Sequence, residues 1–150
     1  MNSLQILEIL SKDSFSKKYF NSVLSIDELP PVSSKLKSIA FITNTDKSSG
    51  KGEHWLSVFY DRKSNCQFFD SIGFGPEIYG MENFLLSTSK SIQINKYPIQ
   101  SVFSELCGYY SILFILTRSR GISFNNFLKY FDSDTFNNDL KINNLIKTFY

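Results

Sequence analysis

The spacing of apolar residues predicts helices in the first part of the chain. Between residues 3 and 10 the apolar positions recur largely at helical intervals, and Asn2 or Ser3 can cap the start of the helix. Residues 13–20 suggest a second short helix, which must end before Pro30 and Pro31 because proline does not fit inside a helix. We therefore expect most of residues 1–37 to form a helical lid on the edge of a sheet.

Four later segments have the short, β-branched and aromatic composition of strands. They are residues 38–44, 55–60, 66–70 and 91–95. The polar residues 61–65 predict a hairpin turn between the second and third of these strands. The alternation of polar and apolar residues in the last strand predicts that it is half exposed.

Helical patterns separate and follow these strands. Pro76 suits the first turn of a helix that runs to about Leu86, and an apolar helix begins at Cys107 and ends near residues 118–121. The apolar spacing further along suggests two closing helices. No repeat or linker divides the chain, so we expect one domain over residues 1–150. We expect an α+β fold in which helices flank a small central mixed β-sheet.

The composition is that of a globular protein, with 42% hydrophobic and 16% aromatic residues. The net charge of +2 is too small to predict nucleic-acid binding. Two cysteines do not make a disulfide framework, and the start of the chain lacks the pattern of a signal peptide. The longest apolar run, Ile112 to Leu116, falls far short of the ~20 residues that cross a membrane. We therefore expect a soluble intracellular protein in a reducing compartment.

Cys107 is the first candidate for chemistry. It lies at the expected start of an apolar helix, where the positive end of the helix dipole favours the thiolate, the nucleophilic form of cysteine. Gly108, directly behind it, leaves room for a substrate backbone to approach. A free cysteine is more often a small buried hydrophobic residue, and we assign that role to Cys66, in the middle of a predicted strand.

His54 is the only histidine, so a histidine-based metal site has no second ligand of its kind. A lone histidine is more often structural or simply exposed. Asp70 ends the next strand of the same hairpin, although by itself it could be a solvated carboxylate or the first residue of a turn. The hairpin should bring both residues to one rim of the sheet, where the carboxylate can fix the imidazole tautomer for general-base catalysis.

Gln100 precedes Cys107 by seven residues, on the loop that enters the helix. Its side-chain amide could donate an N–H to a developing oxyanion, together with backbone N–H groups at Cys107 or Gly108. Taken alone, a loop glutamine is a solvated surface residue. Gln100 becomes a catalytic candidate only as the fourth member of a set whose chain order is His, Asp, Gln, Cys.

This set resembles the adenain family, the adenovirus maturation cysteine proteases, and more distantly the SUMO-deconjugating proteases. The matching segments are Gly52 to Trp55, Phe69 to Phe74, and Gln100 with Cys107 to Tyr109. The similarity extends from the first predicted strand through the cysteine helix. The chain order differs from that of papain-like enzymes, in which the cysteine comes first.

The resemblance implies a role for each residue. Cys107 would be the nucleophile and His54 the general base. Asp70 would orient His54, and Gln100 would be a donor in the oxyanion hole. Adenain has glutamate in the third position and the SUMO proteases have aspartate, so Asp70 fits the wider group. Trp55 would lie beside the active site, and we expect Trp55, Gly52 and Gly108 to contact the substrate. We expect neither a cofactor nor a metal.

We therefore expect a cysteine endopeptidase of the adenain type, encoded by a virus or a virus-like mobile element. It would cleave capsid or other precursor proteins through a Cys–His–Asp triad and a thioester intermediate. The family implies small residues, often glycine, next to the cut. Such a protein would act as a monomer in the virion or in the nucleus or cytoplasm of the host cell. Two alternatives stay open: a host-directed protease that deconjugates ubiquitin-like modifiers, and a catalytically silent interaction module.

Adenain is activated by a short viral peptide and by DNA, so the resemblance implies these partners as well as a polypeptide substrate. The viral peptide is disulfide-linked to a cysteine upstream of the glutamine. The corresponding stretch around Ser87 to Ser91 has no cysteine, so that tether is absent. The net charge of +2 gives little support for DNA, and we expect no membrane partner.

Overall fold

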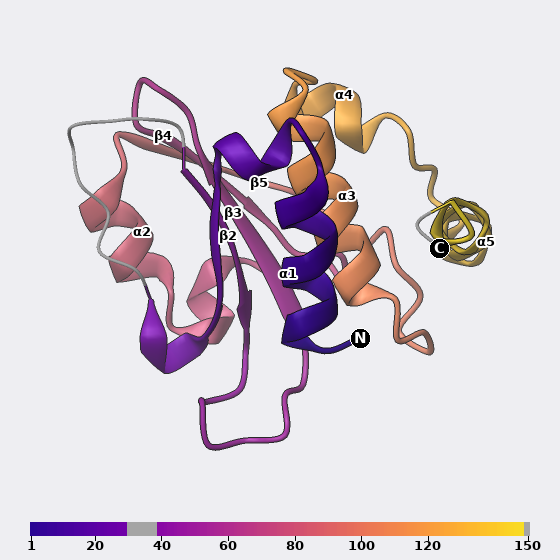
Figure 1. Cartoon of the computed structure of the whole chain (residues 1–150), viewed down its shortest axis with the longest axis horizontal. Coiled ribbons are helices and arrows are strands. Elements are labelled where there is room, and N and C mark those ends of the chain that lie inside the picture. The colour runs from indigo at the N-terminus through magenta and orange to yellow at the C-terminus, as the bar shows by residue number, and fades with distance from the viewer. Residues whose placement is uncertain (30–38, 149–150) are drawn as a thin grey trace.

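A mixed five-stranded sheet lies at the centre of the fold (Figure 1). The computed structural model describes residues 1–29 and 39–148. The strands lie side by side in chain order: β1 (Phe20–Ser25), β2 (Ile39–Asn44), β3 (Trp55–Tyr60), β4 (Asn65–Phe69) and β5 (Ser91–Ile94). The two outer pairs, β1 with β2 and β4 with β5, are parallel, and the inner pairs are antiparallel. The predicted α+β fold with a small mixed sheet is confirmed.

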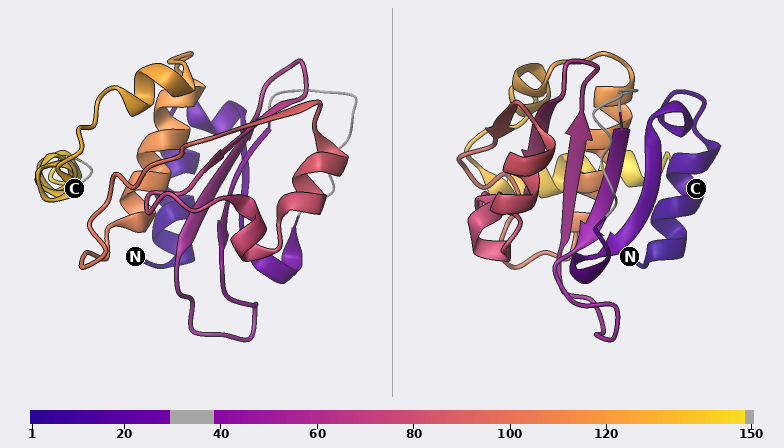
Figure 2. Two further views of the ribbon diagram at one scale, coloured as in Figure 1. Left: turned by 180° about the vertical axis from the view of Figure 1, so that it is seen from behind. Right: turned by 90° about the vertical axis from the view of Figure 1, so that its left-hand side faces the viewer.

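Helices cover both faces of this sheet (Figures 1 and 2). On one face lie α1 (Ser3–Lys12) and α3 (Cys107–Ser119), with α4 (Phe124–Leu128) following α3, and on the other lies α2 (Glu82–Thr88). α5 (Thr135–Ile146) lies beyond α3, on the side away from the sheet (Figure 1). Short 3-10 helices, η1 (Ser16–Lys18), η2 (Ile26–Glu28) and η3 (Pro76–Tyr79), occur in the connections.

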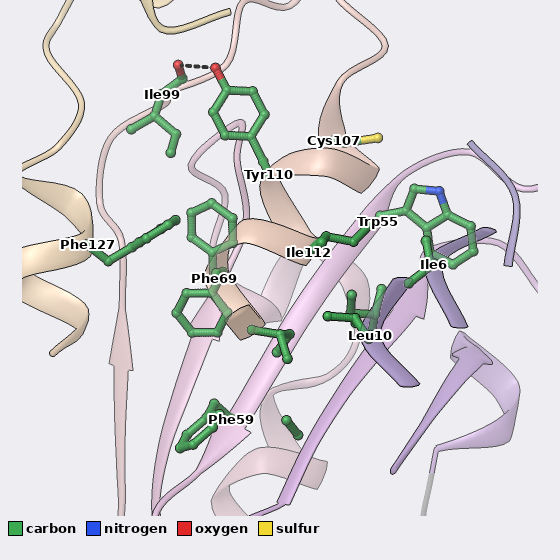
Figure 3. Close-up of a cluster of buried hydrophobic side chains, with 14 of the residues drawn as sticks. Ile6, Leu10, Trp55, Phe59, Phe69, Ile99, Cys107, Tyr110, Ile112 and Phe127 are labelled. Carbon is green, nitrogen blue, oxygen red and sulfur yellow. Dashed lines mark hydrogen bonds between the residues drawn. The ribbon is translucent and has the colours of Figure 1, made fainter. Parts of the chain in front are cut away.

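β3 is the central strand, and all six of its residues are buried. Trp55 and Phe59 pack into the cluster that α1 and α3 complete (Figure 3), while Leu56, Val58 and Tyr60 pack with α2. Side chains alternate between the two faces of a strand, so a strand covered on both sides is apolar throughout. The strand predicted over residues 55–60 is confirmed.

Two serines join α3 to β3. The Ser57 hydroxyl donates to the Ser111 carbonyl at 3.3 Å, and the Ser111 hydroxyl donates to the Trp55 carbonyl at 3.2 Å. Both hydroxyls are buried, so each bond satisfies a polar group that would otherwise be costly inside the core. These bonds fix the first turns of α3 against the start of β3, and therefore fix Cys107 relative to His54.

The N-terminal region differs from the predicted helical lid. α1 is confirmed, with Asn2 as its N-cap. The second helix predicted over residues 13–20 is wrong, because only η1 is helical there and β1 begins at Phe20 as an edge strand. β1 forms by pairing with β2, a long-range contact that local apolar spacing does not report. The predicted break at Pro30 and Pro31 lies outside the described residues.

The helix predicted from Pro76 to about Leu86 is present in two pieces, η3 and α2. Gly80 lies between them in the left-handed region, with φ of 69°. Glycine adopts this conformation at little cost, and it commonly ends a helix. The other predicted strands and the two closing helices are confirmed as β2, β4, β5, α4 and α5, with shifts at their ends.

Candidate active site

His54 and Asp70 meet at one rim of the sheet. His54 immediately precedes β3 and Asp70 immediately follows β4, and these two strands are antiparallel neighbours. The start of one strand therefore lies beside the end of the other. His54 Nε2 is 2.7 Å from Asp70 Oδ1, so the predicted pair forms the hydrogen bond that orients the imidazole.

The Asp70 carboxylate is fully buried and surrounded by donors. Oδ1 also accepts the Ile72 backbone N–H at 3.0 Å, while Oδ2 accepts the Phe74 backbone N–H at 3.1 Å and the Tyr79 hydroxyl at 2.7 Å. A buried carboxylate is costly unless donors of this kind satisfy its lone pairs. They also hold Asp70 in one orientation, so His54 has a fixed partner.

Two residues that support Asp70 were not predicted from the sequence. Tyr79 ends η3, and its ring centroid lies 6.3 Å from that of His54. Burial and the neighbouring Asp70 carboxylate raise the pKa of Tyr79, so its hydroxyl stays protonated and can donate. Asn95, just after β5, accepts the Asp70 backbone N–H at 3.0 Å and donates to the Asp70 carbonyl. Both reach Asp70 from other parts of the chain, so no local pattern marks them.

Cys107 is the first residue of α3, and its thiol interacts with the imidazole of His54. Because His54 Nε2 faces Asp70, Nδ1 is the ring nitrogen left for the sulfur. The backbone N–H groups of Trp55 and Gly108 also lower the pKa of this thiol. Figure 3 shows the sulfur at the start of α3, on the side of the helix where Trp55 lies. Thiol, imidazole and carboxylate therefore form one connected series.

The pKa values of the cysteine and the histidine are shifted toward an ion pair. Burial by itself raises the pKa of Cys107, but the hydrogen bond and charge of His54 and the two backbone N–H groups lower it below its ordinary value. Burial also disfavours the imidazolium, but Asp70 and Cys107 outweigh it and raise the pKa of His54 to about 9. Between these two pKa values a thiolate facing an imidazolium is the favoured state. The N-terminal end of α3 favours the thiolate further.

Cys66 has the opposite environment. It is fully buried in β4, in the apolar cluster that includes Phe41, Tyr60 and Phe68. Burial raises the pKa of the Cys66 thiol to about 12, so this cysteine stays protonated. The prediction that Cys66 belongs to the core is confirmed.

Gln100 lies in the loop before α3 and is only 3% exposed, so it is not the solvated residue that a lone loop glutamine usually is. Its Oε1 accepts the Ser71 hydroxyl at 2.6 Å, and its Nε2 donates to the Ser104 carbonyl at 2.8 Å. A carbonyl can only accept, so these bonds decide which end of the amide is nitrogen. That nitrogen carries a second N–H, which can serve an anion beside Cys107.

A cavity of about 620 Å³ connects these groups, and its lining includes Cys107, His54 and Gln100. The rest of the lining comes from the N-terminus, the β2–β3 loop and the loop before α3, for example Asn2, Lys47, Lys51, Val102 and Glu105. Ligand clefts in proteins commonly occupy roughly 300–1,000 Å³. Cys107, His54 and Gln100 thus face one cleft of suitable size.

The three residues predicted to contact substrate have different surroundings. Trp55 and Gly52 line the cleft, Trp55 with its indole N–H donating to the Met1 carbonyl at 3.3 Å and Gly52 with φ of 84°. Gly108 does not offer the predicted room: a Cβ there would lie 2.9 Å from the Met1 sulfur and 3.2 Å from Trp55 Cδ1. The space beside Gly108 is filled by Met1 and Trp55. The missing side chain lets these groups pack on α3 instead.

Within the described part of the chain, no three His, Cys, Asp or Glu side chains gather as they would around a metal ion. Among residues 1–29 and 39–148, no helix has the length and apolar content that crossing a membrane requires.

Comparison with known proteins gives distant relatives with a related chemistry. No family model matches the chain. The chain is 29% identical over 125 residues to the cysteine protease S273R of African swine fever virus, isolate Tick/Malawi/Lil 20-1/1983, a match that covers 75% of this chain and 45% of that protein. The corresponding protein of isolate Pig/Kenya/KEN-50/1950, named SUMO-1 cysteine protease S273R, is 29% identical over 124 residues with the same coverage.

The chain is a distant homologue of these viral cysteine proteases. The predicted resemblance to adenain-like and SUMO-deconjugating proteases is confirmed at that level. The chain spans less than half the length of these curated relatives.

Two solved structures are similar to the chain. The central domain of the uncharacterized Lpg1148 protein of Legionella pneumophila matches 99% of this chain and 97% of its own, with a TM-score of 0.55 at 14% identity. The crystal structure of the African swine fever virus pS273R protease matches 65% of this chain and 40% of its own, with a TM-score of 0.45 at 28% identity. The first of these similarities concerns the fold alone.

Proposed function

We propose that the chain is a cysteine peptidase in which Cys107, His54 and Asp70 form the catalytic triad. One observation carries this proposal: His54 Nε2 lies 2.7 Å from a buried carboxylate, and the same imidazole lowers the pKa of the Cys107 thiol. A histidine and an aspartate alone can be structural, but a thiol whose pKa that histidine lowers has the environment of a nucleophile. The distant homology to cysteine proteases supports the same chemistry.

In the proposed reaction, the Cys107 thiolate attacks the carbonyl carbon of the scissile peptide bond. The carbonyl oxygen becomes negatively charged, and the second N–H of Gln100 Nε2 and backbone N–H groups at the start of α3 stabilise it. The His54 imidazolium gives its proton to the leaving amine as the C–N bond breaks, which leaves a thioester on Cys107.

Hydrolysis of the thioester completes the cycle. Neutral His54 takes a proton from a water molecule while the water oxygen attacks the thioester carbonyl. The C–S bond breaks, the carboxylic acid product leaves, and the thiolate and imidazolium are restored. Asp70 holds the imidazole in the required tautomer throughout.

The finer proposal is an endopeptidase of the adenain type, with an adenain-like fold, that processes precursor proteins of a virus or a virus-like element. It rests on the order His, Asp, Gln, Cys along the chain and on relatives from African swine fever virus. We propose that residues 1–150 act as one monomeric domain on polypeptides with small residues, such as glycine, next to the cut. Trp55 and Gly52 in the cleft lining are the candidates for contact with such a substrate.

Deconjugation of ubiquitin-like modifiers is the second candidate function. The observation in its favour is the relative named SUMO-1 cysteine protease. Cleavage after a modifier uses the same thiolate attack on a carbonyl, so the geometry of the triad suits both reactions.

Two probes distinguish these functions. The purified chain is incubated with a peptide library derived from an unfolded proteome, and separately with SUMO-1 and ubiquitin that carry a C-terminal vinyl sulfone after diglycine. Cys107→Ala is the matched control, and Cys66→Ala is the control for the second thiol. Cleavage of the library that Cys107→Ala abolishes, without labelling by either modifier, is the expected result.

Labelling of Cys107 by a modifier probe would replace the endopeptidase proposal with deconjugation. Absence of both reactions in the wild-type chain, or equal activity in Cys107→Ala, would overturn the peptidase proposal.

A further inference from the structure

A second buried carboxylate lies outside the triad, on α5. Asp139 is 7% exposed, and its Oδ1 accepts the Tyr110 hydroxyl at 2.8 Å. Its Oδ2 accepts the Ser101 backbone N–H at 3.3 Å. Because a buried carboxylate is costly, its presence here requires these donors, and they come from α3 and from the loop before it. Asp139 therefore connects three segments that are distant in sequence.

Tyr110 is the α3 member of this connection, three residues after Cys107. Its ring is fully buried, and its hydroxyl oxygen lies 3.2 Å from the Ile99 carbonyl (Figure 3). The same oxygen lies 2.8 Å from Asp139 Oδ1. Burial and the Asp139 carboxylate raise the pKa of Tyr110, so the hydroxyl remains a donor. The helix that begins with Cys107 is thereby bonded to the loop that carries Gln100.

Gln100 is held from both of its neighbours. On one side, the Ile99 carbonyl accepts the Asn138 side-chain amide at 3.0 Å and lies 3.2 Å from the Tyr110 hydroxyl, whose single hydrogen it shares with Asp139 Oδ1. On the other side, the Ser101 N–H is bonded to Asp139. Residues of α3 and α5 thus hold the backbone immediately before and after Gln100, the candidate oxyanion donor.

Hydrogen bonds also connect this loop to the side-chain amide of Gln100. The Ser101 carbonyl accepts the Ser104 backbone N–H at 3.1 Å, and the Ser104 carbonyl accepts Gln100 Nε2 at 2.8 Å. A series of hydrogen bonds therefore runs from Asp139 through the turn at residues 101–104 to the side chain that would face the oxyanion. An oxyanion donor has to be placed within about 0.5 Å, and loops are less precise supports than helices.

We propose that Tyr110 and Asp139 form a positioning unit, which fixes Gln100 relative to Cys107 by bonding its loop to α3 and α5. This inference rests on the peptidase function proposed above. Neither residue lines the cleft. Both act through the loop that carries Gln100. This segment has no secondary structure of its own, so these bonds hold the oxyanion donor in place.

Tyr110→Phe and Tyr60→Phe are a matched pair of variants. Each removes one fully buried, hydrogen-bonded hydroxyl, and Tyr60 is bonded to Thr88 on the opposite face of the sheet. On a peptide that the wild-type chain cleaves, we expect Tyr110→Phe to lower kcat about tenfold with little change in KM, because the donor is displaced from the developing charge. Tyr60→Phe should leave kcat unchanged.

Two inhibitors separate positioning from general damage. A peptide aldehyde forms a thiohemiacetal whose oxygen occupies the oxyanion position, whereas iodoacetamide alkylates the thiol without forming an oxyanion. Tyr110→Phe should weaken aldehyde binding about tenfold and leave the alkylation rate of Cys107 and its pH profile unchanged. In a Gln100→Ala background, Tyr110→Phe should have no further effect on kcat, since the two changes act on one donor.

Equal kcat values for Tyr110→Phe and Tyr60→Phe in an active enzyme would overturn the positioning unit. So would full, additive effects of Tyr110→Phe in the Gln100→Ala background. A wild-type chain that neither cleaves any peptide nor binds the aldehyde would instead remove the peptidase proposal on which the unit rests.

Discussion

Cys107 and Cys66 are two buried thiols of one chain with opposite chemical environments. Cys107 begins a helix beside His54, and this histidine and two backbone N–H groups lower the pKa of its thiol. Cys66 lies inside β4 among aromatic side chains, and burial raises its pKa to about 12. Burial acts on both thiols in the same direction. The difference comes from His54 and two backbone N–H groups, which outweigh burial at Cys107, whereas Tyr60 alone does not outweigh it at Cys66.

Two sets of contacts in the fold bring the candidate site residues together. The antiparallel pairing of β3 with β4 brings His54 to Asp70, and the serine bonds between β3 and α3 bring Cys107 to His54. β4 also contains Cys66, where burial outweighs the hydrogen bond of Tyr60 and keeps the thiol protonated. The Asp70 carboxylate follows the end of this strand, a few residues after the inert thiol.

The largest effect is expected from serine substitutions of the two cysteines. Cys107→Ser should lower kcat by at least about a thousandfold, because a hydroxyl with its far higher pKa does not form the anion beside His54. It should leave the free energy of unfolding nearly unchanged. Cys66→Ser should do the reverse: it places a hydroxyl in an apolar cluster, which costs about 1–3 kcal/mol, while kcat stays near the wild-type value.

Urea unfolding and peptide cleavage measured on both variants test this contrast. Loss of activity in Cys66→Ser that exceeds its loss of folded protein, or activity retained in Cys107→Ser, would show that the assignment of the two thiols is wrong.

The next largest effect is expected from Asp70→Asn. The amide keeps the size of the carboxylate, but it loses the charge that favours the imidazolium and can present a donor where Nε2 of His54 also donates. We expect kcat/KM to fall on the order of a thousandfold, as for a triad whose histidine adopts the wrong tautomer. Asp61→Asn, at the β3–β4 turn, is the control for loss of one aspartate on the same hairpin. Similar activities of the two variants would contradict a role for Asp70 in orienting His54.

Activity should also depend on pH in a way set by the two shifted pKa values. The imidazolium of His54 is present below its raised pKa of about 9, and the thiolate of Cys107 is present above its lowered pKa. kcat/KM should therefore rise with pH through the acid limb, level off, and fall about tenfold per pH unit above about 9. In Asp70→Asn the alkaline limb should move to lower pH, because Asp70 is one cause of the raised pKa of His54. An alkaline limb in the ordinary range of a free imidazole would contradict the coupled pair.

The smallest effect is expected from Tyr79→Phe. This change removes one of the four donors to Asp70 and leaves the hydrogen bond to His54 in place. We expect kcat/KM to fall about threefold to tenfold, in line with the worth of one hydrogen bond to a charged group. Tyr130→Phe, whose ring is exposed and far from Asp70 in the chain, should have no effect. A Tyr79→Phe variant as inactive as Asp70→Asn would show that the tyrosine, not the aspartate, controls the histidine.

Local patterns in the sequence predicted most of the sheet and the helix of Cys107. β3 is apolar on both faces and β5 alternates, so each segment carries its own burial pattern. β1 could not be recognised in this way, because Phe20 to Ser25 becomes a strand only through its pairing with β2. Gly80 divides a predicted helix because its left-handed conformation depends on the turn it closes.

The proximity of the candidate site residues was predictable because their order and the hairpin between them imply it. His54 and Asp70 flank one turn, and Gln100 and Cys107 flank one loop. The supporting residues were not predictable, since Tyr79, Asn95 and Asp139 approach through the tertiary fold from separate segments. The expectation for Gly108 failed for the same reason: Met1, distant in sequence, fills the space beside it.

Alkylation of the individual cysteines tests most directly whether His54 activates the Cys107 thiol. The folded chain is treated with iodoacetamide across a range of pH, and the modification of each cysteine is followed by mass mapping, with His54→Ala measured in parallel. We expect rapid modification of Cys107 near neutral pH, no modification of Cys66 in the folded chain, and a shift of Cys107 reactivity to higher pH in His54→Ala. Equal modification of the two cysteines, or an unchanged pH profile of Cys107 in His54→Ala, would contradict it.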